Sequence, residues 1–190
     1  MKEQIDRNFE ESVATICQSR EHLAGRIEQA VEIIRKRLQA GGGVYIFGNG
    51  GSASDAQHIT GELVGRFQAE RKAPKAFALV GNASVLTCIG NDYGYDRVFS
   101  RQLEAMASPG DVAVALTTSG NSPNVVLALA EARKIGMKTV VFTGGGGGKC
   151  AALADVLLDV PSTHTARIQE AHAVIYHTIC QLVEQFFVGA

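Results

Sequence analysis

A strand, a glycine loop and a helix follow one another between residues 44 and 66. Residues 44–47 are apolar and β-branched or aromatic, which predicts a buried strand. Gly48, Gly50 and Gly51 then allow a tight turn and a close backbone approach to a ligand. Residues 52–66 have helical composition, with Ser52 as the expected N-cap. The exposed amides and positive dipole of such a helix start are suited to a phosphate group.

A polar pair stands one turn further into this expected helix. His58 and Glu62 are four residues apart and therefore share a face. The pattern also fits a loose dinucleotide fingerprint, but that motif requires an acidic residue at the end of the next strand, where Gly81-Asn82 stands. A purely structural turn with a solvated pair is the other alternative. We favour a phosphate site with the pair beside it.

Bulk properties exclude several classes of protein. A chain of 190 residues with a net charge of −1 predicts one domain, and it argues against nucleic acid or a membrane surface as a partner. No apolar run reaches the length of a membrane span, and the N-terminus does not read as a signal peptide. The four cysteines are scattered, as in a reduced protein. We therefore expect a cytoplasmic protein.

The rest of the chain alternates helical and strand-like segments. Residues 3–40 predict two amphipathic helices, an arm (residues 1–42) that covers the sheet or pairs with another subunit. Nearly continuous apolar runs predict buried parallel strands. The expected strands are 44–47, 76–80, 111–116, 138–143 and 155–160, and the expected helices are 52–66, 83–90, 98–107, 124–135 and 165–188. We expect a single α/β domain over residues 1–190.

A second loop suited to an anion follows the strand at 111–116. Thr117, Thr118, Ser119 and Ser122 stand directly before an expected helix. Taken alone, these hydroxyl residues can equally be N-cap residues of that helix. Two such loops after parallel strands predict a phosphosugar site at the carboxyl edge of the sheet. The glycine run before Lys149 is not a nucleotide P-loop, because Thr143 and Cys150 stand where that motif needs Gly and Ser or Thr.

The last expected helix carries a narrow polar line beside its apolar stripe. Gln169, Ala173 and His177 follow one another at steps of four residues. A histidine on a helix is usually a satisfied core or surface residue. That simpler interpretation loses weight if His58 and Glu62 converge with Gln169 and His177.

Together these motifs resemble the phosphoheptose isomerase family of the SIS (sugar isomerase) fold. The resemblance covers nearly the whole chain. Its most specific part is the combination of His58, Glu62, Gln169 and His177, whereas any SIS domain shares the glycine and serine loops. The motifs are Gly48–Ser52, His58-x-x-x-Glu62, Gly90-Asn-Asp92, Thr117–Ser122 and Arg167-Ile-Gln169-Glu with His177.

The resemblance implies a fold, an assembly and a reaction. It implies a three-layer, flavodoxin-like SIS fold with a five-stranded parallel sheet between helices, preceded by the two N-terminal helices. It implies a homotetramer with active sites between subunits. The implied reaction converts sedoheptulose 7-phosphate to D-glycero-D-manno-heptose 7-phosphate, the first step towards ADP- or GDP-heptose for bacterial lipopolysaccharide or related surface sugars.

The resemblance also implies roles for individual residues. His58, Glu62, Gln169 and His177 would hold one zinc ion per subunit. Glu62 would be the catalytic base and His177 its acid/base partner, because an aldose–ketose isomerase moves protons between neighbouring carbons. A Glu62 bound tightly to zinc is a poorer base, which leaves the role of the metal open. The substrate would be bound by Asn49, Gly50, Gly51, Ser52, Glu62, Asn91, Asp92, Thr117, Thr118, Ser119, Ser122 and Gln169.

One departure and several rival functions stand beside this interpretation. Relatives often carry an aspartate before the Ile-Gln-Glu segment, where this chain has His164-Thr165-Ala166. The alternative function is a non-catalytic SIS tetramer that binds a replication initiator or senses a phosphosugar. An isomerase of another sugar phosphate is a further rival. The presence of both Glu62 and His177 favours catalysis.

Overall fold

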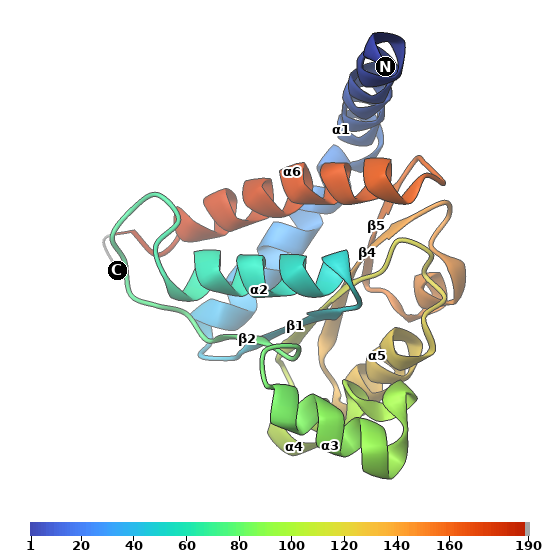
Figure 1. Cartoon of the computed structure of the whole chain (residues 1–190). Helices are drawn as coiled ribbons and strands as arrows, with labels where there is room; N and C mark the ends of the chain where they lie inside the picture. The colour runs from blue at the N-terminus through green and yellow to red at the C-terminus, as the bar shows by residue number, and fades with distance from the viewer. Residues whose placement is uncertain (189–190) are drawn as a thin grey trace.

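The computed structural model of the protein describes residues 1–188. Five parallel strands form one sheet in the order β2-β1-β3-β4-β5 (Figure 1). The strands are β1 (Val44–Gly48), β2 (Ala76–Ala78), β3 (Val112–Leu116), β4 (Lys138–Gly144) and β5 (Val156–Val160). The helices are α1 (Lys2–Gln39), α2 (Gly51–Val64), α3 (Ala83–Tyr93), η1 (Tyr95–Arg97), α4 (Ser100–Met106), α5 (Pro123–Ile135), η2 (Gly148–Leu153) and α6 (Thr165–Glu184), where η marks a 3-10 helix.

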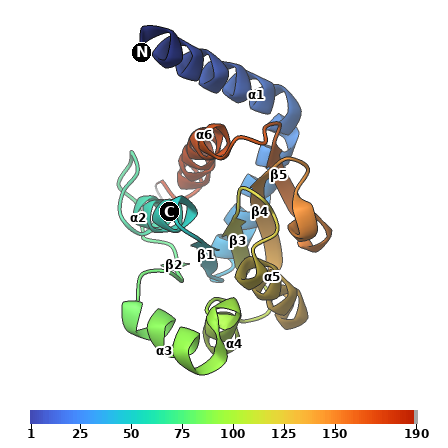
Figure 2. The ribbon, with the colours of Figure 1, turned by 45° about the vertical axis from the view of Figure 1, so that its right-hand side comes forward.

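Helices cover both faces of the sheet and complete a three-layer fold. Helices α1, α2 and α6 lie on one face, and α3, α4 and α5 on the other (Figure 2). Alternate residues of β1 enter the two cores: Val44 and Ile46 face the first, Tyr45 and Phe47 the second. Strands buried on both faces explain the apolar runs in the sequence. The predicted α/β fold with a five-stranded parallel sheet is confirmed.

The prediction of two N-terminal helices is wrong, because α1 is one continuous helix. Residues 2–39 contain no proline, and Gly25 is the only glycine, which a helix tolerates at a cost of about 1 kcal/mol relative to alanine. The C-terminal part of α1 packs into the core through Leu23, Ala30 and Ile34. Its N-terminal part projects away from the body (Figures 1 and 2). Within residues 1–188, no helix is long and apolar enough to cross a membrane.

Several element boundaries also differ from the sequence prediction. The residues expected as a loop at 91–95 partly extend α3, which ends only at Gly94, where φ is +86°. The cap of α2 is Gly50 rather than Ser52, which is buried inside the first turn. Strand β2 ends at Ala78, and α6 ends at Glu184 rather than Val188. Of these boundaries, the start of α2 and the end of α3 lie at glycines.

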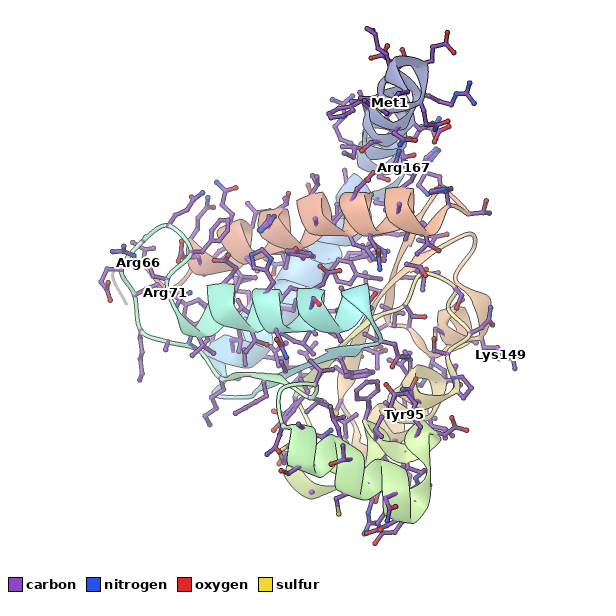
Figure 3. All side chains as sticks on the ribbon, in the orientation of Figure 1. Met1, Arg66, Arg71, Tyr95, Lys149 and Arg167 are labelled. Atoms are coloured by element: carbon purple, nitrogen blue, oxygen red, sulfur yellow. The ribbon has the colours of Figure 1, made fainter. Side chains whose placement is uncertain are left out.

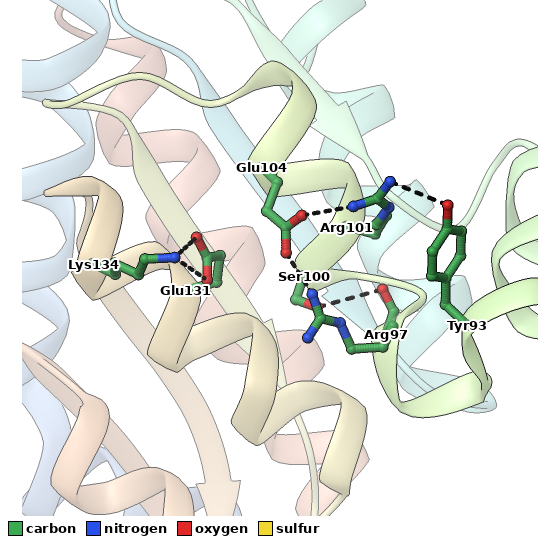
Figure 4. A network of polar contacts seen from close by, with 7 residues as sticks. All are labelled: Tyr93, Arg97, Ser100, Arg101, Glu104, Glu131 and Lys134. Carbon is green, nitrogen blue, oxygen red and sulfur yellow. Dashed lines mark hydrogen bonds and ion pairs between the residues drawn. The ribbon is translucent and has the colours of Figure 1, made fainter.

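Exposed polar contacts connect α3, η1 and α4 on the second face of the sheet (Figure 4). Glu104 of α4 forms ion pairs with Arg97, at 2.7 Å, and with Arg101, at 3.2 Å. Arg101 also donates to the Tyr93 hydroxyl of α3 at 3.3 Å. Exposed ion pairs of this kind typically contribute less than about 1 kcal/mol.

Candidate active site

The two predicted anion loops lie side by side at the carboxyl edge of the sheet. β1 pairs with β2 on one side and with β3 on the other. After β1 the chain adds β2 on one side and then crosses to add β3 on the other side, so the strand order reverses at this point. An open α/β sheet binds its ligands at such a switch point. The loop after β1 leads into α2, and the loop after β3 leads into α5. The structure therefore brings both helix N-termini to the edge where a phosphosugar was expected.

Two asparagine side chains link these loops. Asn49 donates to the Asn124 Oδ1 at 2.9 Å, and Asn124 donates to the Asn49 Oδ1 at 2.8 Å. The Tyr95 hydroxyl approaches the same Asn49 oxygen at 3.3 Å (labelled in Figure 3). Asn124 is almost fully buried and was not predicted as a site residue. The pair holds the β1–α2 and β3–α5 loops in a defined spacing.

The hydroxyl groups of the two loops differ in exposure. Ser52 and Thr117 are buried, with 3% and 5% of their surface exposed. Thr117 Oγ1 lies 3.4 Å from Ser122 Oγ, and both Thr118 and Ser122 are half-buried. Ser119 is exposed and accepts a hydrogen bond from the Asn121 amide at 3.2 Å. Ser119 is therefore the hydroxyl of the β3–α5 loop that is most open to a ligand.

The glycine run after β4 supports the β3–α5 loop. Glycines 145–148 all have φ between +54° and +87°, a region that favours glycine. A Cβ on Gly120 would meet the Gly147 carbonyl oxygen at 2.0 Å. The Cys150 amide donates to the Gly120 carbonyl at 3.0 Å, and the Lys149 amide donates to Asn121 at 3.1 Å. The run is thus packed against the anion loop, and it leads into η2.

Gln169 lies against the start of α2. A Cβ on Gly51 would meet the Gln169 Nε2 at 2.6 Å. Gln169 and His177 lie on the same helix eight residues apart, which is about 12 Å of helical rise. The amide of Gln169 therefore lies beside the expected phosphate loop in this structure. Its predicted place among metal ligands stays a prediction.

Replacing Gly51 with alanine is expected to displace the Gln169 amide. The backbone of Gly51 has no positive φ, so we expect little change in the free energy of unfolding. The predicted contact of Gln169 with a phosphosugar then implies a KM about 10-fold higher or more, because one hydrogen bond to a charged group contributes about 1.5–3 kcal/mol. Steady-state kinetics with Gly61→Ala as control will check this, since a Cβ at Gly61 of the same helix meets nothing within 4 Å. An unchanged KM would contradict the proximity of Gln169 to the ligand.

Three other predicted residues converge between α2 and α6. The His58 Nε2 lies 3.0 Å from Glu62 Oε1 and 3.4 Å from the His177 Nε2. One ligand atom from each of the three lies within 4.8 Å of the others. Two imidazoles and one carboxylate are a donor set of catalytic zinc sites. The residues present therefore fit a divalent cation.

A model of the SIS domain family matches residues 8–144. The phosphoheptose isomerase of Aquifex aeolicus is 48% identical over 185 residues, which cover 97% of both proteins. That of a Geobacter species is 53% identical over 163 residues, 86% of this chain and 85% of the relative. A solved phosphoheptose isomerase from Neisseria gonorrhoeae superposes with a TM-score of 0.92 at 41% identity, covering 97% and 98%. The chain belongs to the phosphoheptose isomerase family.

Membership of the phosphoheptose isomerase family confirms the resemblance predicted from the sequence motifs. It also confirms the class of enzyme, a sugar-phosphate isomerase. The roles of individual residues stay predictions. Asn91 and Asp92, expected to bind substrate, lie exposed on the last turn of α3, where the Asn91 amide donates to Asp92 at 2.7 Å.

Sequence reasoning missed several residues around the cluster of His58, Glu62 and His177. The Tyr176 hydroxyl lies 3.1 Å from the His58 Nδ1, and the ring of Phe67 stacks on His177 at a centroid distance of 5.9 Å. No local pattern announces these contacts, because they join α6 to α2 and to the loop after it. The sequence signal for Tyr176 was its position directly before His177.

Glu184 holds the loop that carries Phe67. Its carboxylate accepts hydrogen bonds from the backbone amides of residues 67, 68 and 69 at 2.9–3.1 Å. Arg71 lies 3.4 Å away, and both side chains are almost fully buried. Arg71 also donates to the backbone carbonyls of Glu62 and Gly65 (Arg71 is labelled in Figure 3). The loop beside His177 is therefore fastened to the end of α6.

His172, by contrast, has a structural role. It is fully buried, and its Nε2 lies 3.0 Å from the Thr143 carbonyl oxygen. Burial lowers the pKa of His172 to about 4, so the ring is neutral near pH 7. It faces the β4 strand rather than the cluster on the other side of α6.

Proposed function

We propose that this chain interconverts sedoheptulose 7-phosphate and D-glycero-D-manno-heptose 7-phosphate, the first step towards heptose precursors for bacterial surface polysaccharide. The observation that carries the proposal is the convergence of His58, Glu62 and His177 in a chain that belongs to the phosphoheptose isomerase family. A non-catalytic SIS tetramer has no need of this acid/base pair. Conversion of sedoheptulose 7-phosphate by the purified protein, followed by NMR, tests the proposal directly.

The reaction moves a carbonyl from C2 to C1 and requires two proton transfers at carbon. Glu62 takes a proton from C1 of the ketose, and the electron pair of that C–H bond forms the enediolate. A proton then returns to C2, while the hydroxyl proton passes from O1 to O2. His177 is the second acid/base group that serves these transfers. The proposed site thus supplies two acid/base groups, Glu62 and His177, whose ligand atoms lie within 4.8 Å of each other.

A zinc ion, one per subunit, is part of the proposal. His58, Glu62 and His177 would hold it. Gln169 is the predicted fourth ligand, and because it lies about 12 Å of helical rise from His177 in one chain, it would have to complete this set from a neighbouring subunit. When bound, the ion would supply Lewis-acid stabilisation of negative charge on a substrate oxygen. Support comes from the His, Glu and His donor set, whose ligand atoms lie within 4.8 Å of one another. The proton transfers themselves are assigned to the side chains of this chain.

Substrate binding is assigned to the two loops at the switch point. The amides at Gly50 and Gly51 and the hydroxyls of the β3–α5 loop would hold the phosphate and so position the reacting carbons. Asn49, which is paired with Asn124, and Asp92, near the C-terminal end of α3, would contact the substrate. The proposed substrate-binding residues are those predicted from the sequence: Asn49, Gly50, Gly51, Ser52, Glu62, Asn91, Asp92, Thr117, Thr118, Ser119, Ser122 and Gln169.

Replacing Ser119 with alanine is expected to raise the KM about 10-fold and to lower kcat much less. A hydroxyl that holds the phosphate contributes equally to the ground state and the transition state, and its loss affects binding. Steady-state kinetics will separate the two constants, with Ser54→Ala on the exposed surface of α2 as control. A fall in kcat at constant KM would exclude a pure phosphate-binding role.

The proposed assembly is a homotetramer with active sites between subunits. On the projecting part of α1, Ile5, Phe9 and Val13 are 50–72% exposed and lie at steps of four residues, which gives an apolar face suited to another subunit. Glu62 also lies eleven residues beyond Gly51 on α2, about 16 Å of helical rise. A site shared between subunits would bring a base closer to the phosphate loops. Light scattering of the purified protein measures the assembly.

Residues 1–190 form a single SIS domain in this proposal, with residues 1–42 as an arm that packs on the core and on a neighbouring subunit. The cytoplasmic location stays a prediction from the sequence, as do the absence of nucleic acid and of a membrane among the partners. These statements concern the whole chain, whereas the structure describes residues 1–188.

A further inference from the structure

The side-chain amide of Asn49 lies between the two loops at the switch point, and its oxygen has two donors. The Asn124 amide donates to the Asn49 Oδ1 at 2.8 Å, and the Tyr95 hydroxyl donates to the same oxygen at 3.3 Å. An amide oxygen has two lone pairs, so these donors use its capacity. The Asn49 Nδ2 donates to the Asn124 Oδ1 at 2.9 Å, which uses one of its two N–H groups. Asn49 therefore offers a ligand an N–H rather than an oxygen.

The amide of Asn124 is held in one orientation by the backbone. Its Oδ1 accepts a hydrogen bond at 3.0 Å from the Val125 amide, which also donates to the Ser122 carbonyl at 3.1 Å. A reversed Asn124 would turn its Nδ2 towards that N–H and lose the bond. Because Asn124 is only 2% exposed, water does not replace a lost bond easily. The backbone of α5 thus decides which edge of Asn124 meets Asn49.

Tyr95 reaches Asn49 from a third segment. It is the first residue of η1, directly after Gly94, and the two residues that follow η1, Val98 and Phe99, are fully buried in the second core. Its own side chain is 61% exposed (labelled in Figure 3). An exposed hydroxyl has water as an alternative partner, so packing of the core does not require its bond to Asn49. The anchored backbone nevertheless places the hydroxyl at the Asn49 oxygen.

We propose that Asn124 and Tyr95 are positioning residues that present Asn49 to the substrate as a hydrogen-bond donor only. This inference rests on the proposed function, in which Asn49 binds the sugar phosphate. A fixed N–H suits an oxygen of the substrate that accepts, such as a phosphate, carbonyl or hydroxyl oxygen. Asn124 and Tyr95 act through Asn49 and do not themselves contact the substrate.

The first test removes only the hydroxyl of Tyr95. Tyr95→Phe should raise the KM for sedoheptulose 7-phosphate about 3–10-fold, the usual net value of one hydrogen bond, and change kcat less than about twofold. The exposed ring lies outside the core, so we expect the variant to fold normally. Tyr93→Phe is the matched control, because the Tyr93 hydroxyl is also exposed but accepts from Arg101 at 3.3 Å. Its KM should not change.

The second test asks whether both residues act through Asn49. In the Asn49→Ala background, Tyr95→Phe should have no further effect on the KM, because the group that it positions is gone. Asn124→Ala should raise the KM of the parent chain, and this effect should also disappear in the Asn49→Ala background. Asn124 is buried, so denaturant unfolding must show that its variant is folded. Tyr95→Phe carries the test if it is not.

The outcomes separate this inference from the proposed function. An unchanged KM in Tyr95→Phe, with normal conversion by the parent chain, would overturn the positioning role and leave the isomerase standing. An equal effect of Tyr95→Phe with and without the Asn49 side chain would also contradict it, since the hydroxyl would then act directly. If the parent chain binds sedoheptulose 7-phosphate without converting it, the proposed isomerase is wrong, and the same comparison is decided by the Kd from ligand-observed NMR. A parent chain that neither binds nor converts it rejects both.

Discussion

Replacing Glu62 with glutamine is expected to lower kcat by about 10²–10⁴-fold, the contribution of a positioned general base. Glutamine has the shape of glutamate but cannot take a proton from C1. The side chain lies at the end of α2, 3.0 Å from the His58 Nε2 and among residues that packing already holds in place. We therefore expect the assembly and the free energy of unfolding to change little. Steady-state kinetics measures kcat, and light scattering measures the assembly.

The matched control for this substitution is Glu70→Gln. Glu70 is an exposed glutamate on the loop after α2, and the same loss of charge there should leave kcat within a factor of about two, as for surface substitutions with effects within about 0.5 kcal/mol. Retained turnover in Glu62→Gln would remove Glu62 as the base. A loss of the proposed tetramer in that variant would instead assign Glu62 a structural role.

Replacing Glu184 with glutamine is expected to lower the free energy of unfolding by about 3 kcal/mol. The change leaves the buried Arg71 without its charged partner, and breaking a buried ion pair from one side costs about 3–5 kcal/mol. The loop amides at 67–69 lose a carboxylate acceptor at the same time. Because Phe67 stacks on His177, kcat should fall as well. Denaturant unfolding at fixed protein concentration measures the stability.

Glu104→Gln is the control for Glu184→Gln, because Glu104 also pairs with arginines but lies at the surface (Figure 4). We expect it to cost less than about 1 kcal/mol. Equal losses of unfolding free energy in the two variants would show that burial of the Glu184–Arg71 pair adds nothing to stability. A normal kcat in a destabilised Glu184→Gln would separate the loop from catalysis.

The same carboxylate predicts a dependence of stability on pH. Burial alone raises the pKa of Glu184, but the amides of Gln68, Ala69 and Phe67 and the charge of Arg71 outweigh it and hold the pKa below its ordinary value of 4.5. A depressed pKa in the folded state stabilises the protein above pH 4.5, and this contribution is lost as the pH falls through the folded pKa. The difference in stability between the parent chain and Glu184→Gln should therefore shrink below pH 4.5. A difference in stability that stays constant down to acid pH would contradict a depressed pKa of Glu184.

Local patterns predicted the part of the site that is local in the chain. The strand at 44–47, its glycine turn and the pair His58 and Glu62 belong to one β-strand, loop and helix, and the structure places them as expected. The two anion loops were predicted to meet because parallel strands end at one edge, and the pairing of β1 with β3 brings them together. Local composition and the topology of parallel sheets were sufficient for these features.

The contacts between distant elements were beyond local patterns. The contact of His58 with Tyr176 and the bonds of Glu184 to the loop amides both depend on how α6 packs against α2 and the loop after it, which one sequence does not specify. The single helix α1 was missed for another reason. Its buried apolar residues begin only at Leu23, so the sequence favoured a separate element for the exposed first half, although no residue between Lys2 and Gln39 breaks the helix.

The measurement that tests the central claim most directly is incubation of the purified protein with sedoheptulose 7-phosphate in deuterium oxide, followed by NMR before and after chelation. The proposed function predicts heptose 7-phosphate with deuterium at C2, since the proton passes through a side chain that exchanges with solvent. Loss of conversion on chelation and recovery with zinc would support the metal site. No conversion in any sample, by a folded protein that still binds the sugar phosphate, would contradict the isomerase and favour a non-catalytic SIS protein.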